Sequence, residues 1–316
     1  MAGDGTDPGS EPTPGALSEA GRRTSAAVEG LGARRVALYL VLVFAVAFYL
    51  SPLWGGLMTS VKTLEAFSRG LPLVPPAPKG FTLEPWGVAW NVLAPSLLNS
   101  MLFTVPAVLF SATLGSLAAF GLTMIDWRGQ VALVVLFISA IFIPRQAVLI
   151  PVNRFWVLVD LQGTLGALGL WDLPLMREHY AGLIELIVTH TAYGLGICTL
   201  LFRGYYLRLS AEMIEAARLD GASFFAIYRR IVLPLSKPMF AVVVIFQFTG
   251  IWNEFLFGLV LVGAGPGAPA TVALNELSGG ILPTYTRQMA GAFITALPPL
   301  VIYVLFRDQF IEGVRR

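Results

Sequence analysis

The sequence predicts an all-α polytopic membrane protein with six transmembrane helices. Hydrophobic residues make up 56% of its 316 residues, charged residues only 13%, and the mean hydropathy is +0.74. A soluble domain carries about 25% charged residues. The apolar residues gather in runs of about 20, the length that a helix needs to cross a bilayer. The expected membrane spans are 36–60, 97–125, 131–150, 183–202, 239–262 and 289–306.

The segment that precedes the first span differs in composition from the rest. Residues 1–35 are rich in Gly, Pro, Ser, Glu and Ala and hold no long apolar run. Such a segment buries too little apolar surface to offset the entropy lost on ordering. We therefore expect a disordered cytoplasmic tail over 1–35 and a transmembrane domain over 36–316.

Two prolines lie near the end of the third span: Pro144 lies within it and Pro151 follows it directly. We expect the span to end at Pro151, since proline lacks the N–H group that continues a helix. Arg145 is expected near its outer end, where a long basic side chain reaches water.

The basic residues are distributed unequally between the two sides of the membrane. If the N-terminus is cytoplasmic, 14 of the 21 Lys and Arg residues fall on the cytoplasmic side, six fall outside, and Arg145 lies within a span. Cytoplasmic loops of membrane proteins carry this excess of Lys and Arg. The bias predicts that both termini and the basic connection 203–238 are cytoplasmic.

Several functional classes are excluded by composition. A net charge of +2 is too small to indicate a nucleic-acid partner, and the single cysteine, Cys198, forms no intrachain disulfide. Two histidines are too few for a His-rich metal site. The sequence also lacks the G-x4-G-K-[ST] phosphate loop and any Ser/His/Asp constellation, so we expect no enzyme activity and no ATP site in this chain.

The connection 203–238 has the chemistry of a short rigid structure. Ser210 and Ser223 are each expected to cap the start of a helix by accepting backbone N–H groups. Gly221 is expected to end the first helix, because that position favours a positive φ. Pro234 is expected to end the second helix.

This connection also holds a spaced motif. Its residues read EAA-x3-G-x9-I-x-LP, from Glu215 to Pro234. The motif resembles the cytoplasmic coupling loop of ATP-binding-cassette (ABC) importer permeases, which docks into a cleft of an ATPase subunit. The resemblance implies an ATPase-coupling role for Glu215, Ala216, Ala217, Asp220, Gly221, Ile231, Leu233 and Pro234.

Strings in other spans carry the same resemblance. Leu98-Asn99-Ser100, Trp252-Asn253-Glu254-Phe255 and Leu297-Pro298-Pro299 are similar to strings in sugar-type permeases. From residue 36 to 316 the chain resembles the six-span partner of the maltose permease pair, in the carbohydrate-uptake group. The type I ABC importer permease fold, with its cytoplasmic coupling helix, is what this resemblance implies. The glycine-rich stretch 263–280 is similar to glucose permeases and favours glucose or mannose as the cargo.

The resemblance further implies a complex in the cytoplasmic (inner) membrane of a prokaryote. This chain is then one permease subunit of an ATP-driven sugar importer. Its expected partners are the lipid bilayer, a second homologous permease subunit in a heterodimer, two ATP-binding subunits and an extracytoplasmic sugar-binding protein. ATP and Mg are expected on the ATP-binding subunits, and no cofactor or metal is expected in this chain.

Polar side chains within the spans are candidates for the substrate pathway. Such groups are costly at membrane depth and face the bundle interior or a wet cavity. Amides, carboxylates and aromatic rings are also the groups that bind sugars. Bonding to neighbouring helices is an equal alternative. Gln247 and Glu254, seven residues apart, are expected on nearly one helix face. The candidates are Tyr193, Gln247, Trp252, Asn253 and Glu254.

Two other functions remain open at this point. An ABC permease for a non-sugar solute would share the coupling loop. A proton-coupled secondary transporter would instead use Glu185, His190 and Glu254, and would not need that loop.

Overall fold

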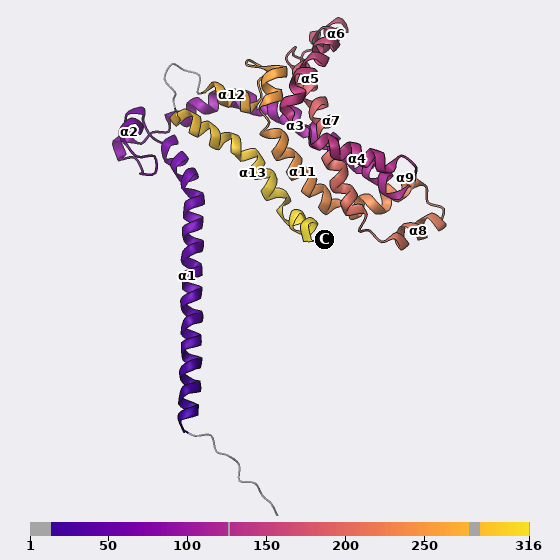
Figure 1. Cartoon of the computed structure of the whole chain (residues 1–316). Coiled ribbons are helices and arrows are strands. Elements are labelled where there is room, and N and C mark those ends of the chain that lie inside the picture. Colours follow the sequence, from indigo (N-terminus) through magenta and orange to yellow (C-terminus); the bar gives the residue numbers. More distant parts are fainter. Residues whose placement is uncertain (1–13, 126, 278–284, 316) are drawn as a thin grey trace, which may run out of the picture.

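The computed structural model describes residues 14–125, 127–277 and 285–315, and helices dominate this part of the chain (Figure 1). Beside them stand short 3₁₀ turns at Pro78–Gly80 and Leu170–Asp172 and an isolated bridge between Lys62 and Phe81. The helices are α1 (Pro14–Ser60), α2 (Leu64–Arg69), α3 (Glu84–Met124), α4 (Gln130–Ile141), α5 (Arg145–Val159), α6 (Leu161–Ala167), α7 (Tyr180–Tyr206), α8 (Ala211–Leu219), α9 (Phe224–Ile227), the π-turn η3 (Tyr228–Val232), α10 (Leu233–Leu235), α11 (Lys237–Trp252), the π-turn η4 (Gly258–Val262), α12 (Ala270–Glu276) and α13 (Tyr285–Arg315).

Within the described residues, four helical stretches are long and apolar enough to cross a membrane. Two bent helix pairs raise the number of spans to six if each pair crosses once. The all-helical membrane architecture predicted from composition is therefore confirmed. The four stretches are Arg34–Ser60, Glu84–Met124, Tyr180–Tyr206 and Tyr285–Ile311.

Helix α1 projects away from the other helices and meets them at its C-terminal end (Figure 1). There Gly56 lies against Met289 and Phe293 of α13. The apolar window of α1 has no buried residue within the described chain. The helix begins at Pro14, within the segment expected to be a tail, while residues 1–13 lie outside the described part. The division at residue 35 stays a prediction.

Helices α3 and α7 form the centre of the bundle. Small residues line their contact, because close approach of two helices requires side chains that leave the backbones free to meet. Gly115 of α3 lies directly against Cys198 of α7, and Gly194 of α7 faces Ser111 of α3. Both helices bury polar as well as apolar residues along this seam.

The third span is bent rather than straight, which corrects the prediction for residues 131–150. Helix α4 meets the stretch Arg145–Ala167, which holds α5 and α6, at 100°. The break lies just before Arg145, where Pro144 caps α5 with an extended ψ of 141°. Pro151 lies inside α5, so the expectation that it ends the span is wrong. The chain turns at Pro144, which follows the end of α4. Pro151 lies within α5, where a proline removes a single backbone hydrogen bond.

The fifth span is also interrupted. Helix α11 ends at Trp252, with Asn253 as its C-terminal cap, and the chain resumes helical turns before η4. Gln247 and Glu254 therefore do not share one helix face, contrary to the prediction, because the helix that would align them stops between them. The helices α9 and α10 join α11 at a bend of 74°.

The close α3–α7 contact predicts a selective sensitivity to an added methyl group. An ideal Cβ at Gly115 would lie 2.5 Å from the Cβ of Cys198, so Gly115→Ala forces the helices apart. Overpacking of this kind costs about 1–3 kcal/mol. We expect a lower melting temperature in detergent. The matched control is Gly121→Ala on the same helix, where no atom of the described residues lies within 4 Å of an added Cβ. Equal melting temperatures for the two variants would contradict the close contact.

Candidate ATPase-coupling site and substrate pathway

The connection between α7 and α11 forms the compact structure that its sequence predicts. The Ser210 side chain accepts a hydrogen bond from the Met213 N–H at 3.3 Å and caps α8. Ser223 caps α9 in the same way, through the N–H of Ala226. Gly221 has a φ of 78°, the left-handed conformation expected of the residue that ends α8. We call residues 210–236 the coupling segment.

Pro234 is the part of this prediction that is wrong. It lies inside α10, in the first turn, instead of ending the helix before it. Proline is well suited to a first turn, because the N–H that it lacks has no partner there. The π-turn η3 carries the chain from α9 into α10, so the helical path continues to Leu235.

The motif residues divide between an exposed and an inward face. Glu215, Ala216, Asp220 and Gly221 are exposed. Leu219 lies beside them with 89% of its surface exposed. A leucine so exposed on a short helix is an apolar patch that a partner protein could cover. The sequence prediction missed Leu219, although its position five residues after the buried Ile214 places it on the opposite side of α8.

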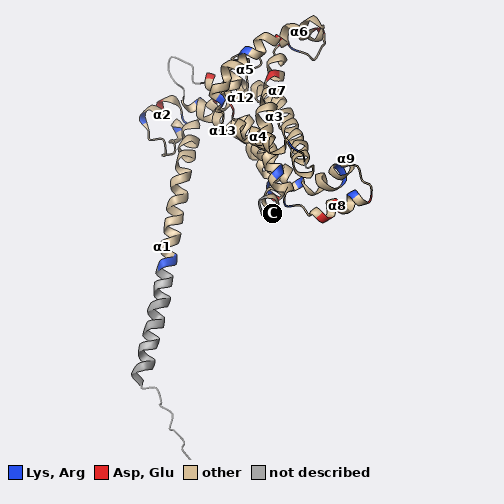
Figure 2. Cartoon of the chain, turned by 45° about the vertical axis from the view of Figure 1, so that its right-hand side comes forward, with Lys and Arg blue, Asp and Glu red and all other residues tan. Residues whose placement is uncertain are grey.

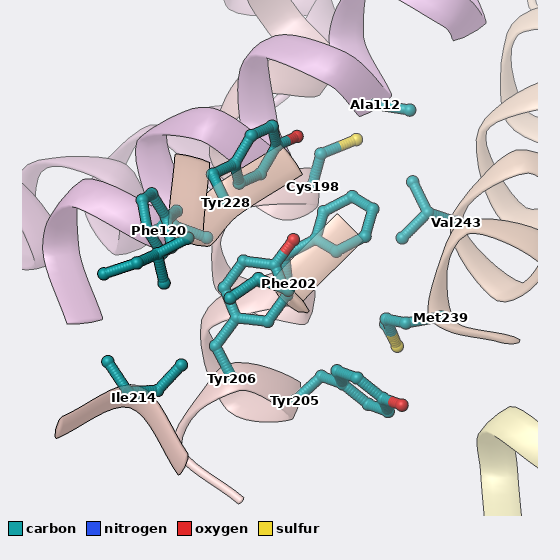
Figure 3. Close-up of a cluster of buried hydrophobic side chains, with 13 residues drawn as sticks. Ala112, Phe120, Cys198, Phe202, Tyr205, Tyr206, Ile214, Tyr228, Met239 and Val243 are labelled. Carbon is teal, nitrogen blue, oxygen red and sulfur yellow. The ribbon is translucent and has the colours of Figure 1, made fainter. Parts of the chain in front are cut away.

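The inward face attaches the coupling segment to the bundle. Ile214 is 4% exposed and belongs to a buried cluster with Phe202 of α7 (Figure 3). Ala217, Ile231 and Leu233 pack against the same cluster. These three motif residues therefore hold the coupling segment to the bundle, while the other five, with the exposed Pro234 among them, lie at the surface.

Charge surrounds the coupling segment. Figure 2 shows Lys and Arg positions in blue along the ribbons of α8 and α9. Arg229 and Arg230 are exposed in η3, and the guanidinium of Arg218 donates a hydrogen bond to the carbonyl of Met124, at the end of α3. This last bond joins α8 to a helix that is distant in sequence.

Two of the candidate pathway residues are engaged within the bundle. Gln247 is 5% exposed, and its amide donates to the Ser111 hydroxyl at 3.2 Å. Trp252 is 1% exposed, and its indole N–H donates to the Thr295 carbonyl at 2.9 Å. Both contacts join helices within this subunit, as expected under the alternative of helix-to-helix bonding.

Glu254 stabilises the interruption of the fifth span. Its carboxylate oxygens accept the backbone N–H groups of Leu256 at 2.8 Å and Phe257 at 2.9 Å. A carboxylate at the start of a helical turn satisfies N–H groups that have no partner in the turn itself. Glu254 also lies 3.9 Å from His190 Nε2, and both side chains are buried. The structure thus brings His190 to Glu254, a pairing that helix spacing within α7 did not reveal.

Tyr193 and Asn253 are the more accessible candidates. Asn253 is exposed, with its amide bound to the Thr249 carbonyl at 2.9 Å. Tyr193 donates to the Ile143 carbonyl at 2.5 Å, at the bend between α4 and α5, and the Arg145 guanidinium lies 5.5 Å from its ring centre. Arg145 thus stands at the bend between α4 and α5, and its expected place near the outer side of the membrane stays a prediction.

A cavity of about 710 Å³ lies beside Tyr193, between α7 and the bent pair α4–α5. Its walls include the aromatic rings of Phe137, Trp156 and Phe257. The indole of Trp156 donates to the Thr189 hydroxyl at 2.9 Å, which fixes the ring. The cavity is of the size that binds small molecules and is mostly apolar, with few polar groups. In the part of the chain that the structure describes, no group of three His, Cys, Asp or Glu residues is placed to hold a metal ion.

The sequence is similar to permeases of known transport systems. It is 44% identical over 293 residues to the xylose/arabinose import permease protein XacI of Haloferax volcanii, covering 91% of this chain and 94% of the relative. It is 30% identical over 286 residues to the glucose import system permease protein GlcU of Saccharolobus solfataricus, covering 87% and 92%. The alpha-glucoside transport system permease protein AglG of Rhizobium meliloti is 31% identical over 240 residues, covering 75% of this chain and 60% of the relative.

The fold also matches a solved transporter. A chain in the crystal structure of a bacterial ABC transporter involved in the import of alginate superposes with a TM-score of 0.59 at 19% identity, covering 90% of this chain and 98% of that one. A family model described as binding-protein-dependent transport system inner membrane component matches residues 98–315. The chain therefore belongs to the family of inner membrane components of binding-protein-dependent transport systems.

Proposed function

We propose that this chain is a permease subunit of an ATP-driven ABC importer for a sugar. The observation that carries the proposal is the coupling segment: a rigid knob whose Glu215-to-Gly221 face is exposed and whose other face is packed into the spans. Such a knob transmits the movement of a soluble partner, because its inward contacts prevent it from bending independently of the bundle.

The partner that drives the knob is a pair of ATP-binding subunits. The sequence holds no phosphate loop, so ATP and Mg bind to other chains of the complex. ATP binding brings the two ATPases together and moves the knob of each permease, and the spans alternate between inward and outward access. The exposed Leu219 and Ala216 supply apolar contact with the ATPase, and Glu215 supplies a charge for a basic partner residue.

The orientation and the remaining partners follow from charge and from the relatives. The excess of basic residues around the coupling segment supports a cytoplasmic location for it and for both termini. A second homologous permease completes the translocation pathway as a heterodimer. An extracytoplasmic binding protein delivers the sugar, as supported by a similar transporter solved with a pentasaccharide-bound periplasmic protein.

A monosaccharide is the substrate class that the relatives support. The xylose/arabinose permease is 44% identical to this chain, and the glucose permease is 30% identical. The xylose/arabinose permease stands well above both the alpha-glucoside permease at 31% and the glucose permease, and this favours a pentose over glucose or mannose. The aromatic walls of the 710 Å³ cavity are suited to the ring face of a sugar.

Energy supply separates the proposed importer from a proton-coupled carrier. With the whole complex in vesicles, we expect sugar uptake when ATP is supplied and a protonophore has collapsed the proton gradient. The buried pair His190 and Glu254 would be central to a proton-coupled carrier, whereas here the Glu254 carboxylate accepts backbone N–H groups at the break in the fifth span. Uptake that requires the proton gradient and ignores ATP would refute the ABC assignment.

Gly221 is expected to be essential for docking of the ATPases. Its φ of 78° strains any residue with a Cβ, at roughly 1–2 kcal/mol, and an aspartate adds a charge to the docking face. We expect Gly221→Asp to abolish ATP-driven uptake and to release the ATPase subunits during purification. Gly169→Asp is the control, since Gly169 has a φ of 72° in a different connection. Retention of the ATPases by Gly221→Asp would argue against the docking role.

Leu219 is expected to anchor the same contact. Replacing its exposed apolar side chain by aspartate should weaken ATPase binding roughly tenfold, which corresponds to about 1.4 kcal/mol. Leu175→Asp is matched for exposure, at 86% against 89%, and lies outside the coupling segment. Binding is measured by titrating purified ATPase subunits onto the permease pair. If both variants bind equally well, Leu219 is not part of the interface.

A further inference from the structure

Three buried hydroxyl groups meet where α3, α7 and the coupling segment come together. The Ser116 hydroxyl oxygen lies 2.6 Å from the phenol oxygen of Tyr206 and 2.9 Å from that of Tyr228. Ser116 is 0% exposed, Tyr206 1% and Tyr228 5%. Buried hydroxyl groups are costly without partners, so these three depend on one another.

Each hydroxyl comes from a different part of the chain. Ser116 lies in α3, Tyr206 is the last residue of α7, and Tyr228 is the first residue of the π-turn η3. A serine hydroxyl has one hydrogen and two lone pairs, so it can bond two phenols at once. One oxygen atom therefore connects two membrane helices and the coupling segment. We call these three residues the hydroxyl joint.

Aromatic packing surrounds the hydroxyl joint. Phe120, four residues after Ser116 on α3, lies 4.3 Å from the ring centre of Phe224 and 5.2 Å from that of Tyr228. Figure 3 shows Phe120, Tyr206 and Tyr228 within the same buried cluster. The contacts of α3 with the coupling segment are thus both polar and apolar, and they span α9 and η3.

The backbone of η3 is irregular at the same place. Its i→i+5 hydrogen bonds include that from the Leu233 N–H to the Tyr228 carbonyl. A π-turn holds an extra residue per turn and changes the direction of the side chains that follow a regular helix, and such turns are frequent at functional sites. Here the π-turn begins at Tyr228, the residue whose phenol binds α3.

Without the hydroxyl joint, no buried hydrogen bond of Ser116 would hold the coupling segment to α3. A push on α8 would then act on α3 through apolar packing and the Arg218-to-Met124 bond. We propose that Ser116, Tyr206 and Tyr228 are positioning residues for energy coupling, which make the coupling segment, α3 and α7 move as one body. The proposal rests on the function proposed above and extends it to residues outside the coupling motif.

Removal of the hydroxyl groups tests the proposal without changing the shape of the rings. The variants are Ser116→Ala, Tyr206→Phe and Tyr228→Phe, and the readout is sugar taken up per ATP hydrolysed by the whole complex in vesicles. We expect Ser116→Ala to lower this ratio roughly tenfold or more, because it removes two hydrogen bonds and one net hydrogen bond corresponds to a factor of about three to ten. The ATPase subunits should remain bound and ATP hydrolysis should continue, because the exposed docking face is unchanged.

Two further variants separate coupling from a loss of folding. The Tyr206→Phe/Tyr228→Phe double variant should lower the ratio at least as much as Ser116→Ala, since it removes the same pair of hydrogen bonds and also the contact of the Tyr206 hydroxyl with Ser236. Tyr303→Phe is the control, because Tyr303 of α13 is 47% exposed and stands outside the joint. A normal ratio in Ser116→Ala would overturn the hydroxyl joint alone, whereas wild-type complex that shows no ATP-driven uptake would overturn the proposed function.

A cross-link tests the common motion directly. The Arg218 side chain reaches the Met124 carbonyl, so a short bis-maleimide, which adds one cysteine thiol across each of its two C=C bonds, can span cysteines at these positions. With Cys198→Ala as background, Met124→Cys/Arg218→Cys complexes are assayed before and after cross-linking. If α3 and the coupling segment move as one body, uptake continues after the cross-link forms. Uptake that stops on cross-linking would show relative movement and contradict the proposal.

Discussion

In the hydrocarbon core of a bilayer no water is available to a backbone N–H or C=O group, so every interruption of a helix needs a partner from the protein. This constraint explains the polar residues of the fifth span. The helix stops after Trp252, and the carboxylate of Glu254 accepts the N–H groups of Leu256 and Phe257 that the break leaves without helical partners. The bend of the third span follows the same rule, because the Ile143 carbonyl accepts the phenol of Tyr193.

The same constraint shapes the contact of α3 with α7. Lipid tails are as apolar as the side chains of a span, so close packing replaces the hydrophobic effect as the force that joins two helices. Gly115 and Gly194 allow α3 and α7 to pack closely. Beside this contact, the Ser111 hydroxyl accepts a hydrogen bond from the Gln247 amide. The coupling segment is attached to this close contact of α3 and α7. A movement of the coupling segment reaches the rest of the bundle only if these helices do not deform.

The coupling segment joins two chemical environments. Its outer face, with Glu215 and Leu219, is exposed. Its inner face continues the bundle through Ile214 and the hydroxyl groups around Ser116. The membership of the chain in a family of transport components is consistent with this division, since a permease without a phosphate loop receives its energy through contact.

The sequence by itself determined the class of protein, the approximate spans and the local structure of α8. These features depend on composition, on apolar runs of bilayer length and on the capping chemistry of Ser210 and Gly221, all of which act over a few residues. Only the tertiary structure decided where the spans bend, which motif residues face inward, and that His190 meets Glu254. Those outcomes depend on pairings between helices that are far apart in sequence, such as Ser116 with Tyr228, and no local pattern in a single chain encodes which helix will lie beside which.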